Sequence, residues 1–183
     1  MKTLAKPFIL LFLIGVTFSG CEQIKSLADV EFDSELSADL NVTVPADGLK
    51  SAALVVSFPF DKSATIDPHS DKDIDEYFDN LKSFDITAMT GTFKNVSKPV
   101  KIVSGTISVS SGSTVASWPI ADYEVANSKS ITLDNSDGQW DKVNQILDDK
   151  TAFKARIVGE TSEGGVSFTL HIVIFVTVTA NPL

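Results

Sequence analysis

The sequence has very few of the residues that build covalent cross-links and catalytic clusters. It contains one cysteine, Cys21, and two histidines, His69 and His171. A single cysteine has no disulfide partner within its own chain. Zinc sites and most acid–base sites need several histidine, cysteine or carboxylate side chains close together. We therefore expect no cofactor, and we predict that His171 is a packed, hydrogen-bonded residue of a sheet.

The familiar sequence motifs of enzymes are also missing. There is no G-x-S-x-G nucleophile elbow, no phosphate-binding P-loop and no G-x-G-x-x-G dinucleotide motif. A pair of carboxylates for glycoside hydrolysis has no sequence signature, because the distance between the two groups defines that site. We predict a non-enzymatic protein and keep a hydrolase as the third alternative.

Positive charge is scarce as well. The chain has 15 Lys and Arg residues against 24 Asp and Glu residues, which gives a net charge of −9. Such a surface repels phosphate backbones and anionic lipid headgroups. The composition therefore disfavours nucleic-acid binding, and it gives the folded domain no electrostatic attraction to a membrane.

The N-terminus has the pattern of an export signal. Lys2 and Lys6 precede an apolar run from Pro7 to Phe18. A helix needs roughly twenty apolar residues to span a bilayer, so this run is too short and fits the core of a signal peptide. The motif Phe18-Ser19-Gly20-Cys21 that follows resembles the lipobox of bacterial lipoproteins. The resemblance implies cleavage before Cys21 and a lipid on its thiol, and two or more acyl chains anchor a protein stably.

This N-terminus divides the chain into three parts. Residues 1–20 are the predicted signal peptide, residues 21–28 the lipidated cysteine and a short tether, and residues 29–183 a single domain. The layout resembles the small lipoproteins common in Bacteroidota. That resemblance implies a place in the cell envelope with the membrane as a partner through the lipid on Cys21. We expect the outer membrane rather than the inner one, and the side that the domain faces stays open.

The domain begins with alternating apolar and polar residues, which is the pattern of half-buried strands. The first run extends from Val30 to Val44, and a second follows from Ala52 to Phe60. Between them Pro45-Ala46-Asp47-Gly48 is a turn sequence, so we predict an antiparallel hairpin. The residues from Asp61 to Ser70 are predicted as a polar loop.

Two short helices are predicted from apolar residues at helical spacing. The first contains Ile74, Tyr77, Phe78 and Leu81, with Ser70 as its N-cap, and the second follows Asn135-Ser136-Asp137-Gly138. Further strands are expected at four places. They are Phe84–Phe93, Val100–Ser110 with a bulge around Gly105, Val115–Tyr123 at a sheet edge because of Pro119, and Ser130–Leu133.

The chain closes with two more predicted strands, Phe153–Gly159 and Val166–Thr179. The loop from Glu160 to Gly165 between them favours a second hairpin. The last strand is apolar on both faces at its middle, so we expect it to be central in its sheet or covered by a helix. About eight strands and two short helices predict an all-β antiparallel β-sandwich, either jelly-roll-like or immunoglobulin-like.

One acidic segment is a weak candidate for a metal site. Its possible ligands are Asp67, His69, Asp71, Asp73 and Asp75. The spacing of the aspartates fits the start of an EF-hand loop, but Glu76 stands where the glycine should be and Lys82 where the final glutamate should be. Acidic residues at a helix N-terminus explain the segment without a metal, and we prefer that interpretation.

Aromatic residues suggest where a ligand could bind. Trp140 and Tyr77 lie at helical core spacing, so packing accounts for them. Trp118 and Tyr123, on the predicted edge strand, are the candidate ligand-binding residues. We predict a binding or structural module with an envelope protein or a glycan as its partner, and recognition of a glycan or a hydrophobic small ligand is the leading alternative.

Overall fold

The structure is a computed structural model of the chain, and it describes residues 29–47, 49–50 and 56–181. The predicted signal peptide, Cys21, the tether and the start of the second alternating run lie outside the described residues. Within the described part of the chain, no helix is long and apolar enough to cross a membrane.

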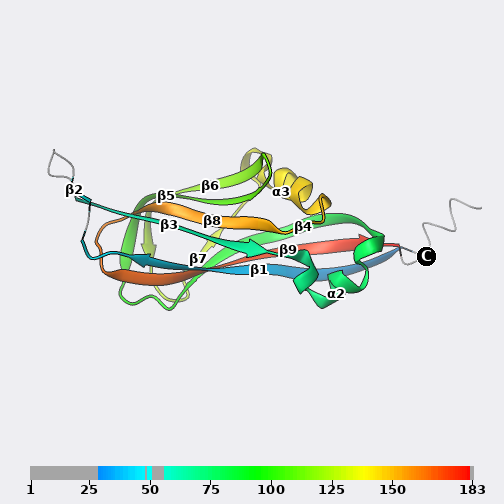
Figure 1. The fold of residues 1–183 in the computed structure, drawn as a ribbon, viewed down its shortest axis with the longest axis horizontal. Helices are drawn as coiled ribbons and strands as arrows, with labels where there is room; N and C mark the ends of the chain where they lie inside the picture. The colour runs from blue at the N-terminus through cyan, green and yellow to red at the C-terminus, as the bar shows by residue number, and fades with distance from the viewer. Residues whose placement is uncertain (1–28, 48, 51–55, 182–183) are drawn as a thin grey trace, which may run out of the picture.

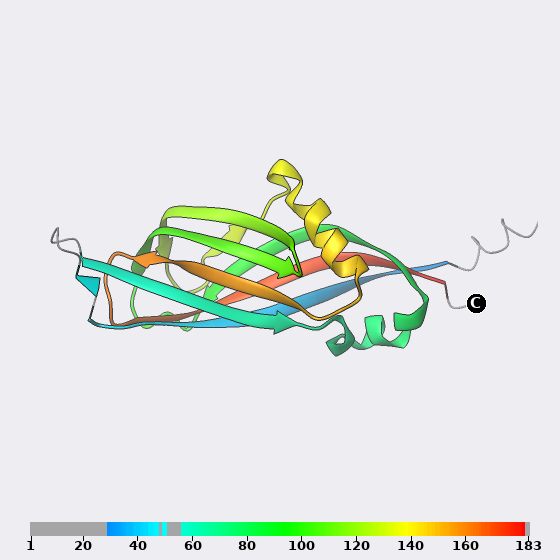
Figure 2. The same ribbon diagram turned by 45° about the horizontal axis from the view of Figure 1, so that its top comes forward.

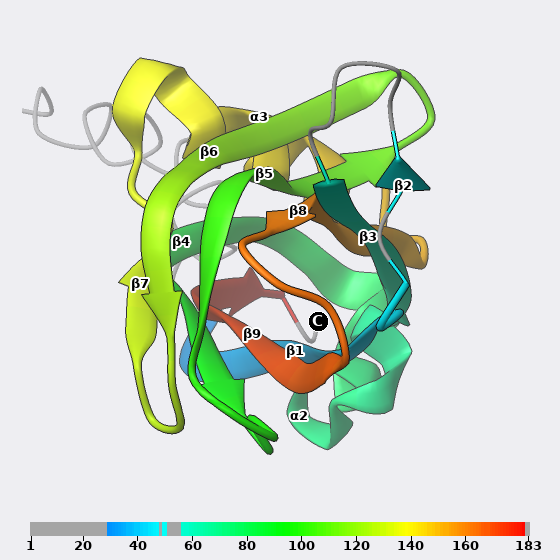
Figure 3. The ribbon, with the colours of Figure 1, turned by 90° about the vertical axis from the view of Figure 1, so that its left-hand side faces the viewer.

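The described residues form two antiparallel sheets packed face to face, which confirms the predicted β-sandwich (Figures 1 and 3). Sheet A has the strand order β1–β9–β4–β7, and sheet B has the order β2–β3–β8–β5–β6. The strands of sheet A are β1 (Val30–Val44), β9 (Val166–Ala180), β4 (Leu81–Lys94) and β7 (Ser130–Thr132). Those of sheet B are β2 (Leu49–Lys50), β3 (Val56–Ile66), β8 (Phe153–Thr161), β5 (Val100–Ser111) and β6 (Thr114–Val125).

The last strand, β9, is central in sheet A, as its apolar middle predicts. It pairs with β1 along the whole length of both strands, from Val30 opposite Ala180 to Val44 opposite Val166, and with β4 on its other side. Buried residues such as Leu170, Ile172 and Ile174 are fully enclosed. Because β1 begins where β9 ends, the two ends of the domain lie together at one end of the sandwich (Figure 1).

Both predicted hairpins are wrong. β1 pairs with β9 and not with β3, and β8 and β9 belong to different sheets. The turn sequences do reverse the chain, but they carry it across the sandwich instead of into a neighbouring strand. The two crossings pack against each other, since a Cβ on Gly164 would lie 2.2 Å from the Pro45 carbonyl oxygen.

A tight hairpin is formed elsewhere, by β5 and β6, which join through Gly112 with a φ of 53°.

The predicted polar loop after Phe60 is also wrong, because β3 continues to Ile66. Residues 58–66 pair with β8, and Ile66, opposite Phe153, is buried. Most residues in the part of β3 after Phe60 are polar and face solvent. Only Ala64 and Ile66 continue the apolar alternation there. The segment therefore has the composition of a loop although it is a strand.

The two helices lie at the margins of the sandwich (Figure 2). The first, α2 (Lys72–Glu76), is flanked by the 3-10 turns η1 (Pro68–Ser70) and η2 (Phe78–Asn80). Its N-cap is Asp71 rather than Ser70, because the Asp71 carboxylate accepts hydrogen bonds from the backbone N–H groups of Asp73 and Ile74.

The second helix, α3 (Gln139–Asp148), follows η3 (Ser136–Gly138) and packs against β4, β5 and β6. Its buried residues Val143, Ile146 and Leu147 close the flank between the two sheets.

The strand β6 forms an edge of sheet B, as Pro119 predicts. It pairs only with β5, and Pro119 has no N–H group to offer a further strand. The Ser117 N–H donates to Oε1 of Gln139 on α3 over 2.8 Å. The proline and the helix together protect this edge from pairing with another chain.

The outer face of sheet B

Alternation along the strands of sheet B places one set of side chains in the core and the other in solvent. Phe153, Ala155 and Ile157 are buried, so their neighbours on β8 point outward. The strand register aligns these residues with outward residues of β3 and β5 in four rows. The rows are Thr65/Lys154/Ser110, Ser63/Arg156/Ser108, Asp61/Val158/Thr106 and Pro59/Glu160/Ser104. We call these twelve residues the outer face of sheet B.

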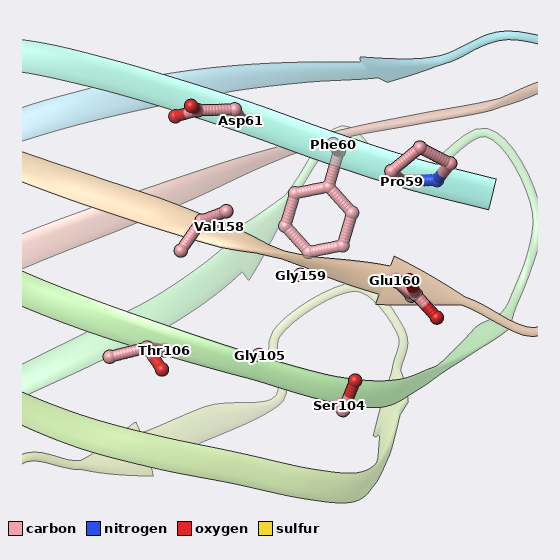
Figure 4. Close-up of a pocket in the computed structure, with 9 residues that line it drawn as sticks. All are labelled: Pro59, Phe60, Asp61, Ser104, Gly105, Thr106, Val158, Gly159 and Glu160. Carbon is pink, nitrogen blue, oxygen red and sulfur yellow. The ribbon is translucent and has the colours of Figure 1, made fainter. Parts of the chain in front are cut away.

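This face contains a shallow depression of about 710 Å³ across β3, β8 and β5 (Figure 4). Gly105 and Gly159 lie opposite each other at its centre. A Cβ on Gly159 would lie 2.4 Å from the Ser104 carbonyl oxygen and 3.0 Å from the Phe60 ring, so only glycine fits. The absence of both side chains lets the two strands approach closely and leaves backbone accessible at the surface. The volume lies within the range of roughly 300–1,000 Å³ that is usual for small-molecule sites.

An arginine and an aspartate are paired beside the depression. Arg156 donates from Nε to Oδ1 of Asp61 over 2.8 Å and from Nη2 to Oδ2 over 2.5 Å. The hydrogen bond from Arg156 is the main cause that lowers the pKa of Asp61, and the same bond raises the pKa of Arg156. Both groups are therefore charged at neutral pH, and the two parallel bonds fix the orientation of the guanidinium.

The other polar side chains of this face have no hydrogen-bond or ion-pair partner among the described residues. No side-chain hydrogen bond within the described part of the chain involves the hydroxyls of Ser63, Thr65, Ser104, Thr106, Ser108 and Ser110. Lys154 and Glu160 make no ion pair with any described residue. These donors and acceptors are therefore available to a ligand.

The outer face of sheet A is different, because its polar side chains bind one another across strands. Thr177 donates to Asp33 over 2.8 Å, Thr169 donates to Asn41 over 2.8 Å, and Thr92 and Ser130 are 2.9 Å apart. His171 lies 2.7 Å from Asp39, so the prediction of a hydrogen-bonded sheet histidine is confirmed.

The candidate ligand-binding residue Trp118 is not accessible to a ligand. Its side chain points into the core with 5% of its surface exposed, and its indole N–H donates to the Asp134 carbonyl oxygen over 2.7 Å. Trp118 lies on an edge strand as predicted, but edge position and outward orientation are separate properties. Pro119, the next residue, is the one that faces out.

Tyr123 is half-buried, packs beside Phe93 and donates its hydroxyl to the Ser130 carbonyl oxygen over 2.8 Å. A second depression, of about 620 Å³, adjoins it. Ligand binding at Tyr123 stays a prediction, and the structure does not bring Tyr123 and Trp118 together as one platform.

The candidate metal ligands act mainly as helix caps. Asp67 accepts a bond from the His69 backbone N–H, and Asp71 caps α2. His69 lies 2.8 Å from Asp75, and its ring stacks on Phe78 with the ring centres 3.5 Å apart. Among the described residues, no three histidine, cysteine, aspartate or glutamate side chains are grouped to hold a metal ion. Helix capping accounts for the contacts of Asp67 and Asp71, while His69 contacts Asp75 and Phe78.

Sequence reasoning missed the outer face of sheet B. One signal was available, because Ser104, Thr106, Ser108 and Ser110 alternate with residues such as Ile107 and Val109 that are buried. The neighbouring hydroxyls of β3 fell in a segment predicted as a loop, and pairing with β8 brings in the only arginine of the chain, Arg156.

The fold and this face define an antiparallel β-sandwich in which the outer face of one sheet is polar and carries hydroxyls without side-chain partners among the described residues. Comparisons with protein-family models, with curated proteins and with solved structures found no match to the chain.

Proposed function

We propose that the protein is a lipid-anchored, non-enzymatic binding module of the cell envelope and that its ligand binds on the outer face of sheet B. The observation that carries the proposal is the set of six hydroxyls on this face that make no hydrogen bond with any described residue. The lipobox at Cys21 supports the anchor and the location.

The chemistry of the face suits a polyhydroxylated ligand, and we propose a glycan. Each sugar hydroxyl both donates and accepts, and so do the hydroxyls of Ser104 and Thr106 at the depression. The carboxylates of Asp61 and Glu160 accept hydrogen bonds, while Val158 and Pro59 offer small apolar surfaces to the C–H groups of a sugar ring. The depression is open to solvent, so an extended chain has room to run through it.

The position of the face is compatible with the proposed anchor. The chain enters β1 at Val30, and the depression lies toward the opposite end, near the start of β3 (Figure 1). A lipid on Cys21 would hold the Val30 end close to the membrane and leave the depression accessible.

A matched pair of tryptophan variants tests this proposal. Ser104 and Ser37 are both exposed serines on outward positions of strands, Ser104 beside the depression and Ser37 on sheet A. The full-length protein in detergent would be screened on an array of envelope and plant glycans as wild type, Ser104→Trp and Ser37→Trp. We expect the wild type and Ser37→Trp to bind the same glycans and Ser104→Trp to lose them. No glycan binding by the wild type, or equal binding by Ser104→Trp, would overturn the proposal.

A further inference from the structure

We infer that one half of the outer face of sheet B is a subsite for the acidic group of an anionic glycan, with Arg156 and Lys154 as its cationic residues. This inference rests on the proposed function and names the ligand class of the same face. It starts from the distribution of charge over the four rows, because both cations lie in two adjacent rows and both carboxylates in the other two.

The two cationic rows share one arrangement. Arg156 has Ser63 on one side and Ser108 on the other, and Lys154 has Thr65 and Ser110. Neighbouring strands are about 4.8 Å apart, and consecutive outward rows are about 6.7 Å apart along a strand. A carboxylate or sulfate placed over either cation therefore has hydroxyl donors within reach on both sides. Charge-assisted hydrogen bonds of this kind are among the strongest polar contacts in proteins.

The guanidinium of Arg156 is oriented to bind an acidic group. Asp61 takes Nε and one hydrogen of Nη2, which leaves Nη1 and the second hydrogen of Nη2 free. The bidentate pair holds the guanidinium plane in place before a ligand arrives, so little conformational entropy is lost on binding. Lys154 adds a positive charge that no described residue pairs.

The charge on the rest of the surface also favours sheet B over sheet A as the face that binds an acidic ligand. The protein carries a net charge of −9, and the outward residues of β1 include Glu31, Asp33, Glu35 and Asp39. The outer face of sheet B carries two cations and two carboxylates, so it repels an acidic chain less than the carboxylates of β1 do, and Arg156 and Lys154 are where an acidic group is favoured on it. The chain continues from there into the depression, where the hydroxyls of Thr106 and Ser104 and the Glu160 carboxylate suit the neutral hydroxyls of a sugar.

The test compares two lysines in matched positions. Lys154 and Lys94 are both exposed, lie on strands and make no ion pair with described residues, but Lys94 is on sheet A. Polygalacturonate, chondroitin sulfate and neutral dextran would be titrated calorimetrically into the full-length protein in detergent. The proteins would be the wild type, Lys154→Gln, Arg156→Lys, Lys94→Gln and Ser104→Trp.

We expect the wild type to bind at least one acidic polymer more tightly than dextran. Lys154→Gln should weaken that binding roughly three- to tenfold, while Lys94→Gln should leave it unchanged. Arg156→Lys keeps the charge but loses the planar fork, so it should weaken acidic binding as well.

Three results would overturn the inference. If dextran binds as tightly as the acidic polymers and Ser104→Trp abolishes all binding, the anionic subsite is wrong and the glycan-binding function stands. If Lys94→Gln and Lys154→Gln weaken binding equally, the attraction is non-specific and the subsite is wrong. If no glycan of either kind binds, both the subsite and the proposed function are wrong.

Discussion

The two outer faces of the sandwich have similar secondary structure and opposite chemistry. On sheet A, hydroxyl, amide, imidazole and carboxylate groups bind one another across strands in four pairs. On sheet B, Arg156 pairs with Asp61 and Lys101 pairs with Asp122 across strands, and six hydroxyls of the outer face make no side-chain hydrogen bond with any described residue. The polar groups of sheet A therefore contribute to stability, and those of sheet B are free for recognition.

Packing of the core does not impose this difference between the two outer faces. In both sheets alternation buries the inward residues, and among the described strands only the middle of β9 is buried on both sides. The core therefore determines the inward side chains and leaves most outward ones open. A hydrogen bond within the protein contributes about 1 kcal/mol, so unpaired hydroxyls on an outer face forgo stability that the same residues obtain on sheet A. Three predictions test how far this contrast holds.

The largest effect is expected at the close approach under the depression. Gly159→Ala places a Cβ 2.4 Å from one backbone oxygen and 2.8 Å from the Gly105 Cα. Neither backbone can move without separating β5 from β8, so we expect a loss of about 3 kcal/mol in the free energy of unfolding. Urea denaturation followed by circular dichroism measures it.

Gly91→Ala in sheet A is the control for that substitution. Its Cβ would lie 3.0 Å from Cδ1 of Leu170 and 3.1 Å from Cγ2 of Ile131, so the clash is milder and involves side chains instead of backbone. The cost should be clearly smaller than at Gly159. Equal costs would show that the backbones at Gly105 and Gly159 are not as close as described.

A smaller effect separates the hydroxyls of the two faces. Thr177 and Thr106 are half-buried threonines on outward positions, and only Thr177 has a side-chain partner, Asp33. Thr177→Val should lower the free energy of unfolding by about 1 kcal/mol, because the bond to Asp33 is lost. Thr106→Val should change it by less than about 0.5 kcal/mol. A loss at Thr106 as large as at Thr177 would mean that the hydroxyls of sheet B are structural too.

The smallest effect concerns the pH dependence of the Arg156–Asp61 pair. The pKa of Asp61 is lowered in the folded protein, so its stabilisation is present above the ordinary value of 3.8 and is lost as the pH falls through the lowered value. Asp61→Asn should have a slightly lower urea midpoint than the wild type at neutral pH, since the pair is exposed and screened. The two midpoints should converge as the pH falls through that lowered value. If the difference between the two urea midpoints stayed constant as the pH falls, the Arg156–Asp61 pair would not be its cause.

Alternation in the sequence was sufficient to predict the class of fold and most of the long strands, but it missed the second half of β3. The apolar phases of β1, β4, β5 and β9 match their buried residues, and the double-sided apolar middle of β9 predicted its central place. A bulge was expected around Gly105, and the register of β5 against β8 shifts between Ile102 and Ser104. These features depend on local periodicity, which the sequence records directly.

Pairing between strands could not be read in the same way. A turn sequence such as Pro45–Gly48 reverses the chain whether the next strand joins the same sheet or crosses to the other one. The orientation of Trp118 depended on the phase of β6, and its proline neighbour gave only the edge position. The outer face of sheet B needed the register of three strands, so alternation in any one of them did not reveal it.

The most direct test of the account is to map where a glycan contacts the protein. Backbone amide chemical shifts of the full-length protein would be followed by NMR while galacturonate oligomers are added. We expect shifts at Thr106, Arg156 and Val158 on sheet B and none at His171 and Phe175 on sheet A. Shifts confined to sheet A would contradict it.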